Sequence, residues 1–209
     1  MPNTMKSRHL PSVLVRELHA GHREKIRSHL LNLSDQDRSM RFGMHTSDEV
    51  IEKYVANLNF ITDALFGVFD HELKLIGFAH LAYPVLDRKH PTAEFGVSVS
   101  EEGRGKGIGS ALFKRAAIHA RNTKIEILYV HCLSTNKVMM HIAKKAGMAV
   151  EFSYGEADAY LRLPKPTSAS IIKEAVQAQA ADIDYAVKRN LKQSKFFLTQ
   201  LWSFASGNK

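Results

Sequence analysis

A short cationic glycine loop is the part of the sequence whose residue types and spacing point most directly to chemistry. Residues 104–109 read Arg-Gly-Lys-Gly-Ile-Gly. The three glycines let the backbone turn sharply and approach a ligand closely, which leaves main-chain N–H groups free to point inward. The arginine and the lysine add positive charge to the same loop. The pattern predicts a binding site for a phosphate or pyrophosphate group.

The elements around the loop strengthen this interpretation. A strand-like run at residues 93–100 precedes it, and a helix-like run at residues 110–121 follows it. The first turn of a helix has unpaired N–H groups and the positive end of the helix dipole, and both favour a bound anion. A strand, a cationic glycine loop and a helix in this order predict a pyrophosphate site.

Apolar periodicity predicts a mixed α/β fold for the rest of the chain. The predicted strands cover residues 13–18, 64–69, 75–83, 93–100, 126–132, 149–154 and 157–163, and the predicted helices cover residues 22–33, 34–41, 46–58, 110–121 and 136–146. Ser34, with Asp37 three residues later, resembles a capping box, and Asn136 can cap the last of these helices. The apolar stripe expected to face inward on that helix is Val138, Met139, Ile142, Ala143 and Ala146.

The character of the chain changes after residue 163. We predict a first domain at residues 1–163 and a C-terminal amphipathic helical extension at residues 164–209. The extension carries an apolar stripe at Ile172, Val176, Ala180, Ile183, Val187 and Leu191, and Phe197, Leu198, Leu201 and Trp202 extend the apolar character. Such a stripe can pack on its own domain, or it can contact a second copy of the chain to give a homodimer. An alanine-rich stripe argues against a membrane-surface helix.

Composition excludes several other classes. A single cysteine, Cys132, forms no internal disulfide and predicts a reducing, cytoplasmic environment. No apolar run approaches the roughly 20 residues that a membrane helix requires. The net charge of +8 attracts polyanions. Because the basic residues are spread along the chain and are not interleaved with aromatic residues, a phosphorylated cofactor explains the charge as well as nucleic acid does, and we predict no nucleic-acid partner.

Two separate motifs resemble the GNAT superfamily of acetyl-CoA-dependent N-acetyltransferases. Arg104, Gly107 and Gly109 match its cofactor signature, in which Arg or Gln is followed by two residues, Gly, one residue, and Gly or Ala. Residues 136–148 are similar to its late segment from Asn to Gly-Phe. The resemblance spans about residues 13–163 and includes the order of the predicted strands.

The resemblance implies a central sheet that is splayed beside the strand at residues 93–100, with acetyl-CoA bound in the resulting cleft. The residues expected to hold the cofactor are Val97, Val99, Arg104, Gly105, Lys106, Gly107, Ile108, Gly109, Ser110 and Asn136. In this scheme the N–H of Val99 donates to the thioester oxygen, where negative charge develops during acyl transfer. Direct transfer requires no metal.

A base is needed because only a neutral amine has the lone pair that attacks the thioester. The resemblance makes Glu94, in Ala-Glu-Phe-Gly-Val, the first candidate, since it is similar to the base of a subset that includes bacterial protein-lysine acetyltransferases. His80 on the preceding strand is the second candidate, and its register against Glu94 is open. Many relatives carry a tyrosine as general acid where this chain has Ala143, so the usual acid is missing. Cys132 has no evident catalytic partner and is expected to be a buried thiol.

The resulting prediction is an N-acetyltransferase that moves an acetyl group from acetyl-CoA directly to a primary amine, on a small molecule or a protein lysine. The alternative is a non-catalytic acyl-CoA sensor or interaction module on the same fold, which the missing acid allows. A nucleic-acid binder is the third reading and predicts binding with a strong salt dependence.

Overall fold

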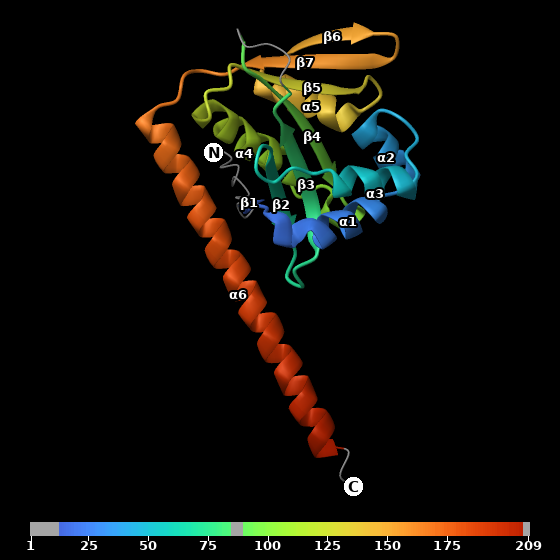
Figure 1. The fold of residues 1–209 in the computed structure, drawn as a ribbon, viewed down its shortest axis with the longest axis vertical. Coiled ribbons are helices and arrows are strands. Elements are labelled where there is room, and N and C mark those ends of the chain that lie inside the picture. The colour runs from blue at the N-terminus through green and yellow to red at the C-terminus, as the bar shows by residue number, and fades with distance from the viewer. Residues whose placement is uncertain (1–12, 85–89, 207–209) are drawn as a thin grey trace, which may run out of the picture.

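The computed structural model describes residues 13–84 and 90–206, and it has a mixed seven-stranded sheet with helices on both faces (Figure 1). The strand order is β1-β2-β3-β4-β5-β7-β6. The strands are β1 (Arg16–Glu17), β2 (Ala64–Phe69), β3 (Leu75–Ala82), β4 (Thr92–Val99), β5 (Ile127–Leu133), β6 (Ala149–Ser153) and β7 (Glu156–Arg162). The helices are α1 (Arg23–Leu31), α2 (Asp35–Phe42), α3 (Asp48–Ala56), α4 (Ile108–Asn122), α5 (Lys137–Ala146) and α6 (Ser168–Ser206), with single 3-10 turns at Ala20–His22 and Glu101–Gly103.

Each face of the sheet has its own apolar core. On one face α4 and α5 pack their buried residues, among them Leu112 and Ile142, against β2 to β5 and β7. On the other face α1 and α3 pack through residues such as Ile26 and Ile51 against Leu65 and the neighbouring positions of β2 and β3. Alternate residues of a strand point to opposite faces, so the sheet separates the two cores.

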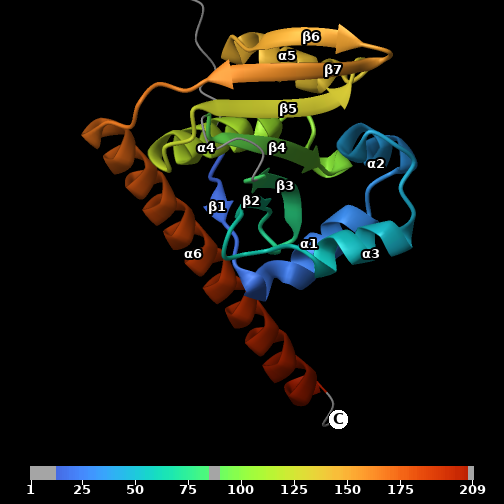
Figure 2. The same cartoon turned by 45° about the horizontal axis from the view of Figure 1, so that its top comes forward.

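The middle of the sheet opens between β4 and β5. These two strands run parallel, but they pair only where Thr92, Ala93 and Glu94 lie opposite Ile127, Leu128 and Tyr129. Beyond that point β4 continues to Val99 and β5 to Leu133 without pairing. The helix α2 lies beside this end of β4 and contacts both strands (Figure 2). The predicted fold class, a mixed α/β sheet splayed at the strand before the glycine loop, is confirmed.

Several element boundaries differ from the sequence prediction. The first strand has two residues, because the chain pairs with β2 only at Arg16 and Glu17. The helix after the glycine loop begins at Ile108, two residues earlier than expected, since Gly107 already occupies its N-cap position. Val138 was expected to face inward, yet it is 71% exposed, because the open side of the sheet leaves that face of α5 uncovered.

The helix α6 covers 39 residues, packs its first part on α4 and β1, and then extends away from the body (Figure 1). The docked side carries Ser170, Glu174, Ala181 and Tyr185, with Ala181 buried and the Tyr185 ring under the guanidinium of Arg16. The apolar stripe predicted from the sequence lies on a different side of the helix and is exposed at Ile172, Val176, Ile183, Val187 and Leu191. The side chains of Phe197, Leu198, Leu201 and Trp202 lie outside the described part. Within the described ranges, no helix has the length and apolarity to cross a membrane.

Candidate active site

The glycine loop has the conformation that the sequence predicted. Gly105 (φ 72°) and Gly107 (φ 74°) both lie in the left-handed region, which residues with a Cβ rarely adopt. Gly107 is the N-cap of α4, and none of the side chains that the structure describes caps that helix end. With respect to these residues, the N–H groups in the first turn of α4 are available to a phosphate oxygen. Ile108 and Gly109, expected in the loop, belong to this first turn together with Ser110.

A cleft leads from the loop along β4. A cavity of about 400 Å³ lies over the loop, between Val99, Gly107, Ser110 and the α5 residues Lys137, Val138, His141 and Ile142. A smaller cavity of about 170 Å³ follows, between Arg41 of α2, Val97 to Val99 of β4, and Asn136 and Met139. One end of the cleft is thus rich in N–H groups and cations, while the other end lies along Val97 to Val99, in the stretch where β4 no longer pairs with β5.

The free edge of β4 faces this cleft. The N–H of Ser100 donates to the carbonyl of Ile76 on the β3 side, at 3.0 Å. Because successive N–H groups of a strand point to alternate sides, those of Val97 and Val99 point away from β3, toward the gap. With no β5 residue opposite them, these backbone groups can pair with an extended ligand, as predicted for Val97 and Val99.

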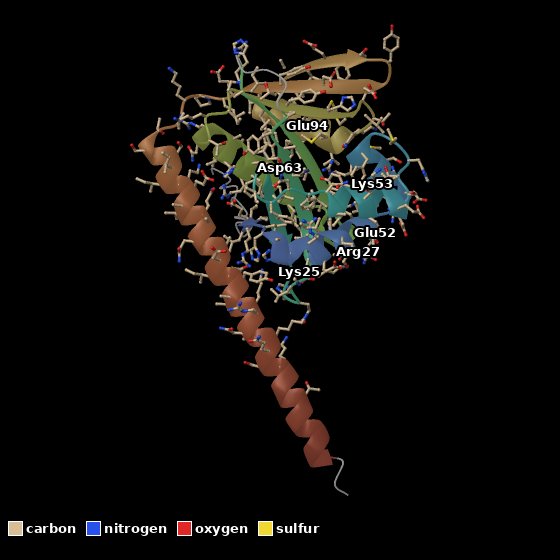
Figure 3. All side chains as sticks on the ribbon, viewed as in Figure 1. Lys25, Arg27, Glu52, Lys53, Asp63 and Glu94 are labelled. Carbon is tan, nitrogen blue, oxygen red and sulfur yellow. The ribbon has the colours of Figure 1, made fainter. Side chains whose placement is uncertain are left out.

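Glu94 lies at the fork itself. It is the last residue of β4 that pairs with β5, where it lies opposite Tyr129, and it lies opposite Ala82 on the other side. Its side chain is exposed, and Figure 3 shows it at the end of β4 nearest β5 and β7. Alternation puts Glu94, Gly96 and Ser98 on the face that carries α1 to α3. The carboxylate is therefore accessible at the fork, at the end of the unpaired stretch of β4 that is remote from the glycine loop.

His80 lies close to Glu94 but has partners of its own. It pairs with Gly96 in the β3–β4 ladder, which answers the question of register and places both side chains on the same sheet face. Its Nδ1 lies 2.8 Å from the Tyr54 hydroxyl and its Nε2 lies 3.0 Å from Oδ2 of Asp63. Burial lowers the pKa of His80 and outweighs the opposite effect of its hydrogen bond to Asp63. His80 is therefore held neutral with both ring nitrogens engaged.

A second polar group borders the fork on β5 and β7. The carboxylate of Asp158 accepts a hydrogen bond from the Tyr129 hydroxyl at 2.6 Å and lies 2.8 Å from Nδ1 of His131. This hydrogen bond to Asp158 raises the pKa of His131, and the two hydrogen bonds, from Tyr129 and from His131, lower the pKa of Asp158. Glu156 lies 3.6 Å from the other ring nitrogen. Acidic groups therefore outnumber cations on the side of the fork that β5 and β7 form.

Two contacts join α2 to residues that border the cleft. Nη2 of Arg104 lies 2.5 Å from Oδ2 of Asp37, and Asn136 donates from Nδ2 to the carbonyl of Met40 at 3.3 Å. Asn136 also caps α5, since its Oδ1 accepts from the N–H of Met139 at 3.0 Å. Arg104 and Asn136, both predicted to contact the cofactor, thus border the cleft and link it to α2.

Ala143 and Cys132 both belong to the apolar core. Ala143, a residue of α5, is fully buried there. Cys132 is buried too, its Sγ lies 3.8 Å from the Ala157 carbonyl, and burial raises its pKa, which disfavours the nucleophilic thiolate. Sequence reasoning missed Arg41, Tyr54 and Asp63, which lie on α2, α3 and the segment before β2, because no local spacing shows that they meet.

The fold and the cleft together define an α/β protein with an open sheet edge beside a phosphate-type loop. The model of the acetyltransferase (GNAT) family matches residues 29–148, which is more than half of the chain, and the chain therefore belongs to this family. A search of curated protein sequences found no significant match.

Solved structures with the same fold are distant in sequence. The GNAT domain of PAT from S. lividans is 20% identical, with a TM-score of 0.60 over 71% of this chain and 89% of that one. Spermidine N-acetyltransferase from Vibrio cholerae, solved with CoA and spermine, is 22% identical, with a TM-score of 0.56 over 72% and 95%. A ribosomal-protein-alanine N-acetyltransferase from Brucella melitensis is 15% identical, with a TM-score of 0.55 over 72% and 100%. At these identities the likeness shows the shared fold.

Proposed function

We propose that this protein transfers an acetyl group from acetyl-CoA directly to a primary amine, on a small molecule or a protein lysine. The observation that carries the proposal is the unpaired edge of β4, whose Val97 and Val99 N–H groups face a cleft that begins at a phosphate-type loop, while Glu94 lies where the unpaired stretch starts. The pyrophosphate would lie on the N–H groups of the loop and the first turn of α4. The pantetheine arm would pair with the free edge of β4.

Glu94 is the proposed base. A carboxylate that is exposed at the fork can take the proton from the attacking amine, directly or through one water molecule. The N–H of Val99 would stabilise the oxyanion, since it points into the cleft. His80 is less suited to accept this proton because its two ring nitrogens already bind Tyr54 and Asp63. We therefore propose that His80 positions its neighbours.

Release of free thiol from acetyl-CoA in the presence of a panel of amines tests the proposal. We expect turnover with at least one amine, and we expect Glu94→Gln to lower kcat by about 10²- to 10⁴-fold, the usual contribution of a general base. Glu151→Gln, an exposed carboxylate on β6, is the matched control. Tight binding of acetyl-CoA without turnover across the panel would favour the acyl-CoA sensor, and full activity of Glu94→Gln would remove Glu94 from the mechanism.

We also propose that α6 pairs with α6 of a second copy. Its apolar stripe repeats every eleven residues, since Ile172, Val176 and Ala180 are followed by Ile183, Val187 and Leu191. Such a repeat keeps the stripe on one side of a nearly straight helix. The five larger residues are each more than half exposed.

Charge favours an antiparallel pair. The first half of α6, residues 168–187, carries three acidic residues and one lysine, whereas residues 188–206 carry four basic residues and no acidic one. Antiparallel helices place the basic half of one copy beside the more acidic half of the other, and parallel helices would place the two basic halves together. The partner proposed for α6 is therefore a second copy of this chain.

Light scattering coupled to size-exclusion chromatography tests the pairing. The wild type should be a dimer, and Ile183→Asp should be a monomer because it introduces a charge into the stripe. Thr199→Asp is the control, since residue 199 lies about five turns after Ala181 on the docked side of the helix. A monomeric wild type that binds anionic vesicles through α6 would replace the dimer with a membrane-surface role.

A further inference from the structure

A permanent positive charge lies at the reactive end of the cleft. Arg41, near the end of α2, borders the smaller cavity together with Val97 and Asn136. Its guanidinium lies flat on the backbone of Gly96, because a Cβ added there would lie 2.5 Å from Cζ and Nη1 and 2.6 Å from Nη2. Only glycine leaves room for this group. Gly96 precedes the free edge of β4, so the charge lies between that edge and Glu94.

A chain of hydrogen bonds fixes the guanidinium in this place. Nη2 of Arg41 donates to the Tyr54 hydroxyl at 3.0 Å. Arginine can only donate, so the Tyr54 proton is free to go to Nδ1 of His80, and the His80 proton then lies on Nε2, toward Asp63. Arg41, Tyr54, His80 and Asp63 thus form one directed chain. It orients Arg41 without placing a carboxylate directly against it.

One buried donor of the Arg41 side chain has no partner. Nε of Arg41 is buried, and no hydrogen-bond partner for it exists among the residues that the structure describes. Buried polar groups in native proteins almost always have a partner, so an orphaned donor on a side chain that lines a cleft points to an acceptor that a ligand brings when it binds. The Arg41 side chain borders the stretch of β4 where the acyl end of the cofactor would lie, since the proposed phosphate site is at the opposite end of the cleft.

We propose that Arg41 is a catalytic residue that stabilises the departing thiolate of coenzyme A. The inference rests on the proposed acetyl transfer. The amine nitrogen forms a bond to the carbonyl carbon, the C–S bond breaks, and its electron pair stays on sulfur, while the amine proton goes to Glu94. Arg41 supplies charge and an N–H and gives up no proton, because a guanidinium stays protonated in proteins. Water later protonates the thiolate. The guanidinium of Arg41, on the opposite face of the sheet, thereby compensates for the absence of an acid at Ala143.

Titration of the thiol of bound coenzyme A tests Arg41 without any acceptor amine. The ultraviolet absorbance of the thiolate reports its ionisation. In the wild type we expect the pKa of the bound thiol to lie about one to three pH units below that of free coenzyme A, as for a group close to an opposite charge. In Arg41→Met this lowering should disappear while coenzyme A still binds. An equal thiol pKa in both proteins overturns the proposal.

Kinetics supply the second readout. Arg41→Met should lower kcat by about 10²- to 10³-fold, the usual effect of losing one group that stabilises transition-state charge, with the KM for acetyl-CoA nearly unchanged. Added methylguanidinium should restore part of kcat in Arg41→Gly and none in Glu94→Gln. Arg27→Met is the control, because Arg27 on α1 pairs with Glu52 of α3 and lies far from Glu94 in Figure 3.

The outcomes separate this inference from the proposed function. One outcome is that no amine supports turnover, while the pKa of the bound thiol is lowered only when Arg41 is present. In that case the proposed acetyl transfer is wrong, but the proposed position of Arg41 beside the sulfur is correct. If the wild type turns over and Arg41→Met keeps its kcat, or if only the KM for acetyl-CoA rises, Arg41 is not catalytic. If Arg41→Met fails to fold, the same measurements are made on Arg41→Lys. It keeps the charge but loses the flat contact with Gly96 and the Nε donor, so it should show an intermediate kcat.

Discussion

Glu174 is expected to hold the first part of α6 on the body of the protein. Its carboxylate accepts hydrogen bonds from Nη1 of Arg115 at 2.7 Å and Nδ2 of Asn122 at 2.6 Å, and it lies 2.7 Å from Nδ1 of His119. Burial alone would raise the pKa of Glu174, but the hydrogen bonds from His119, Asn122 and Arg115 outweigh it and lower the pKa to about 2. The side chain is 17% exposed, so solvent screens these interactions little.

The magnitude follows from the pKa of Glu174. The ordinary value is 4.5 and the folded value is about 2, and the difference corresponds to about 3.4 kcal/mol of stability, at 1.36 kcal/mol for each pH unit. Because the folded pKa is the lower one, this stability is present above pH 4.5 and is lost as the pH falls toward 2. Glu174→Gln should lose about 3 kcal/mol at pH 7, since it also leaves Arg115, whose side chain is 4% exposed, with Glu17 at 3.5 Å as its one acidic partner among the described residues.

Urea unfolding at two pH values measures this effect. The gap in unfolding free energy between the wild type and Glu174→Gln should narrow by about 2 kcal/mol between pH 7 and pH 3. Asp182→Asn is the matched control on the same helix, because it removes an ion pair to Arg16 in which the aspartate is 58% exposed and should cost about 1 kcal/mol or less. A loss below 1 kcal/mol at pH 7, or an equal gap at both pH values, would refute the reasoning.

Two further predictions concern the loop and the sheet. Gly107→Val should weaken acetyl-CoA binding at least about tenfold in calorimetry, because a φ of 74° disfavours a β-branched residue and a side chain would stand beside the phosphate site; unchanged affinity would contradict the assigned role of the loop. Burial lowers the pKa of His29 from 6.5 to about 4. The neutral ring, which lies 3.0 Å from the Leu75 carbonyl and 2.9 Å from the Ser98 hydroxyl, therefore stabilises the fold above pH 6.5, and this part of the stability is lost as the pH falls to 4. His29→Gln should remove up to about 3 kcal/mol of that pH dependence in urea unfolding, and an equally steep dependence in the variant would show that other groups cause it.

Local signals in the sequence predicted much of what holds the cofactor side together. The Ser34 cap of α2 and the Asn136 cap of α5 are both present, since each side chain accepts from the backbone N–H three residues later. Such contacts depend on a few consecutive residues, so their spacing is visible in the sequence. The glycines at 105 and 107 were predictable for the same reason, because a left-handed backbone leaves a residue-type signal at the position itself.

The acyl end of the site could not be predicted in this way. Arg41 contacts Gly96, which is 55 residues away in the sequence. His80 contacts Tyr54 and Asp63, which are 26 and 17 residues away. Nothing in the local pattern marks Gly96 as a seat for a guanidinium, since a glycine in a strand has several other uses. The stripe on α6 was visible, but the side that docks is defined by Glu174 and Tyr185, whose partners lie on α4 and near β1 and β2.

The same splay that creates the cofactor cleft also decides where an acid or a cation can act. On the α5 side, Ala143 is sealed in the core, so even a tyrosine there would first have to displace the packing around it. On the other side, α2 reaches over β4 only because Gly96 has no side chain, and that approach brings Arg41 to the cleft. A family member that lacks an acid on α5 can therefore still stabilise the departing thiolate with a cation from α2. This requires a small residue at the position of β4 that Gly96 occupies here. Gly96→Ala should therefore lower kcat about as much as Arg41→Met does, although it removes no charge from the protein. A normal kcat in Gly96→Ala would show that Arg41 does not need a glycine at position 96.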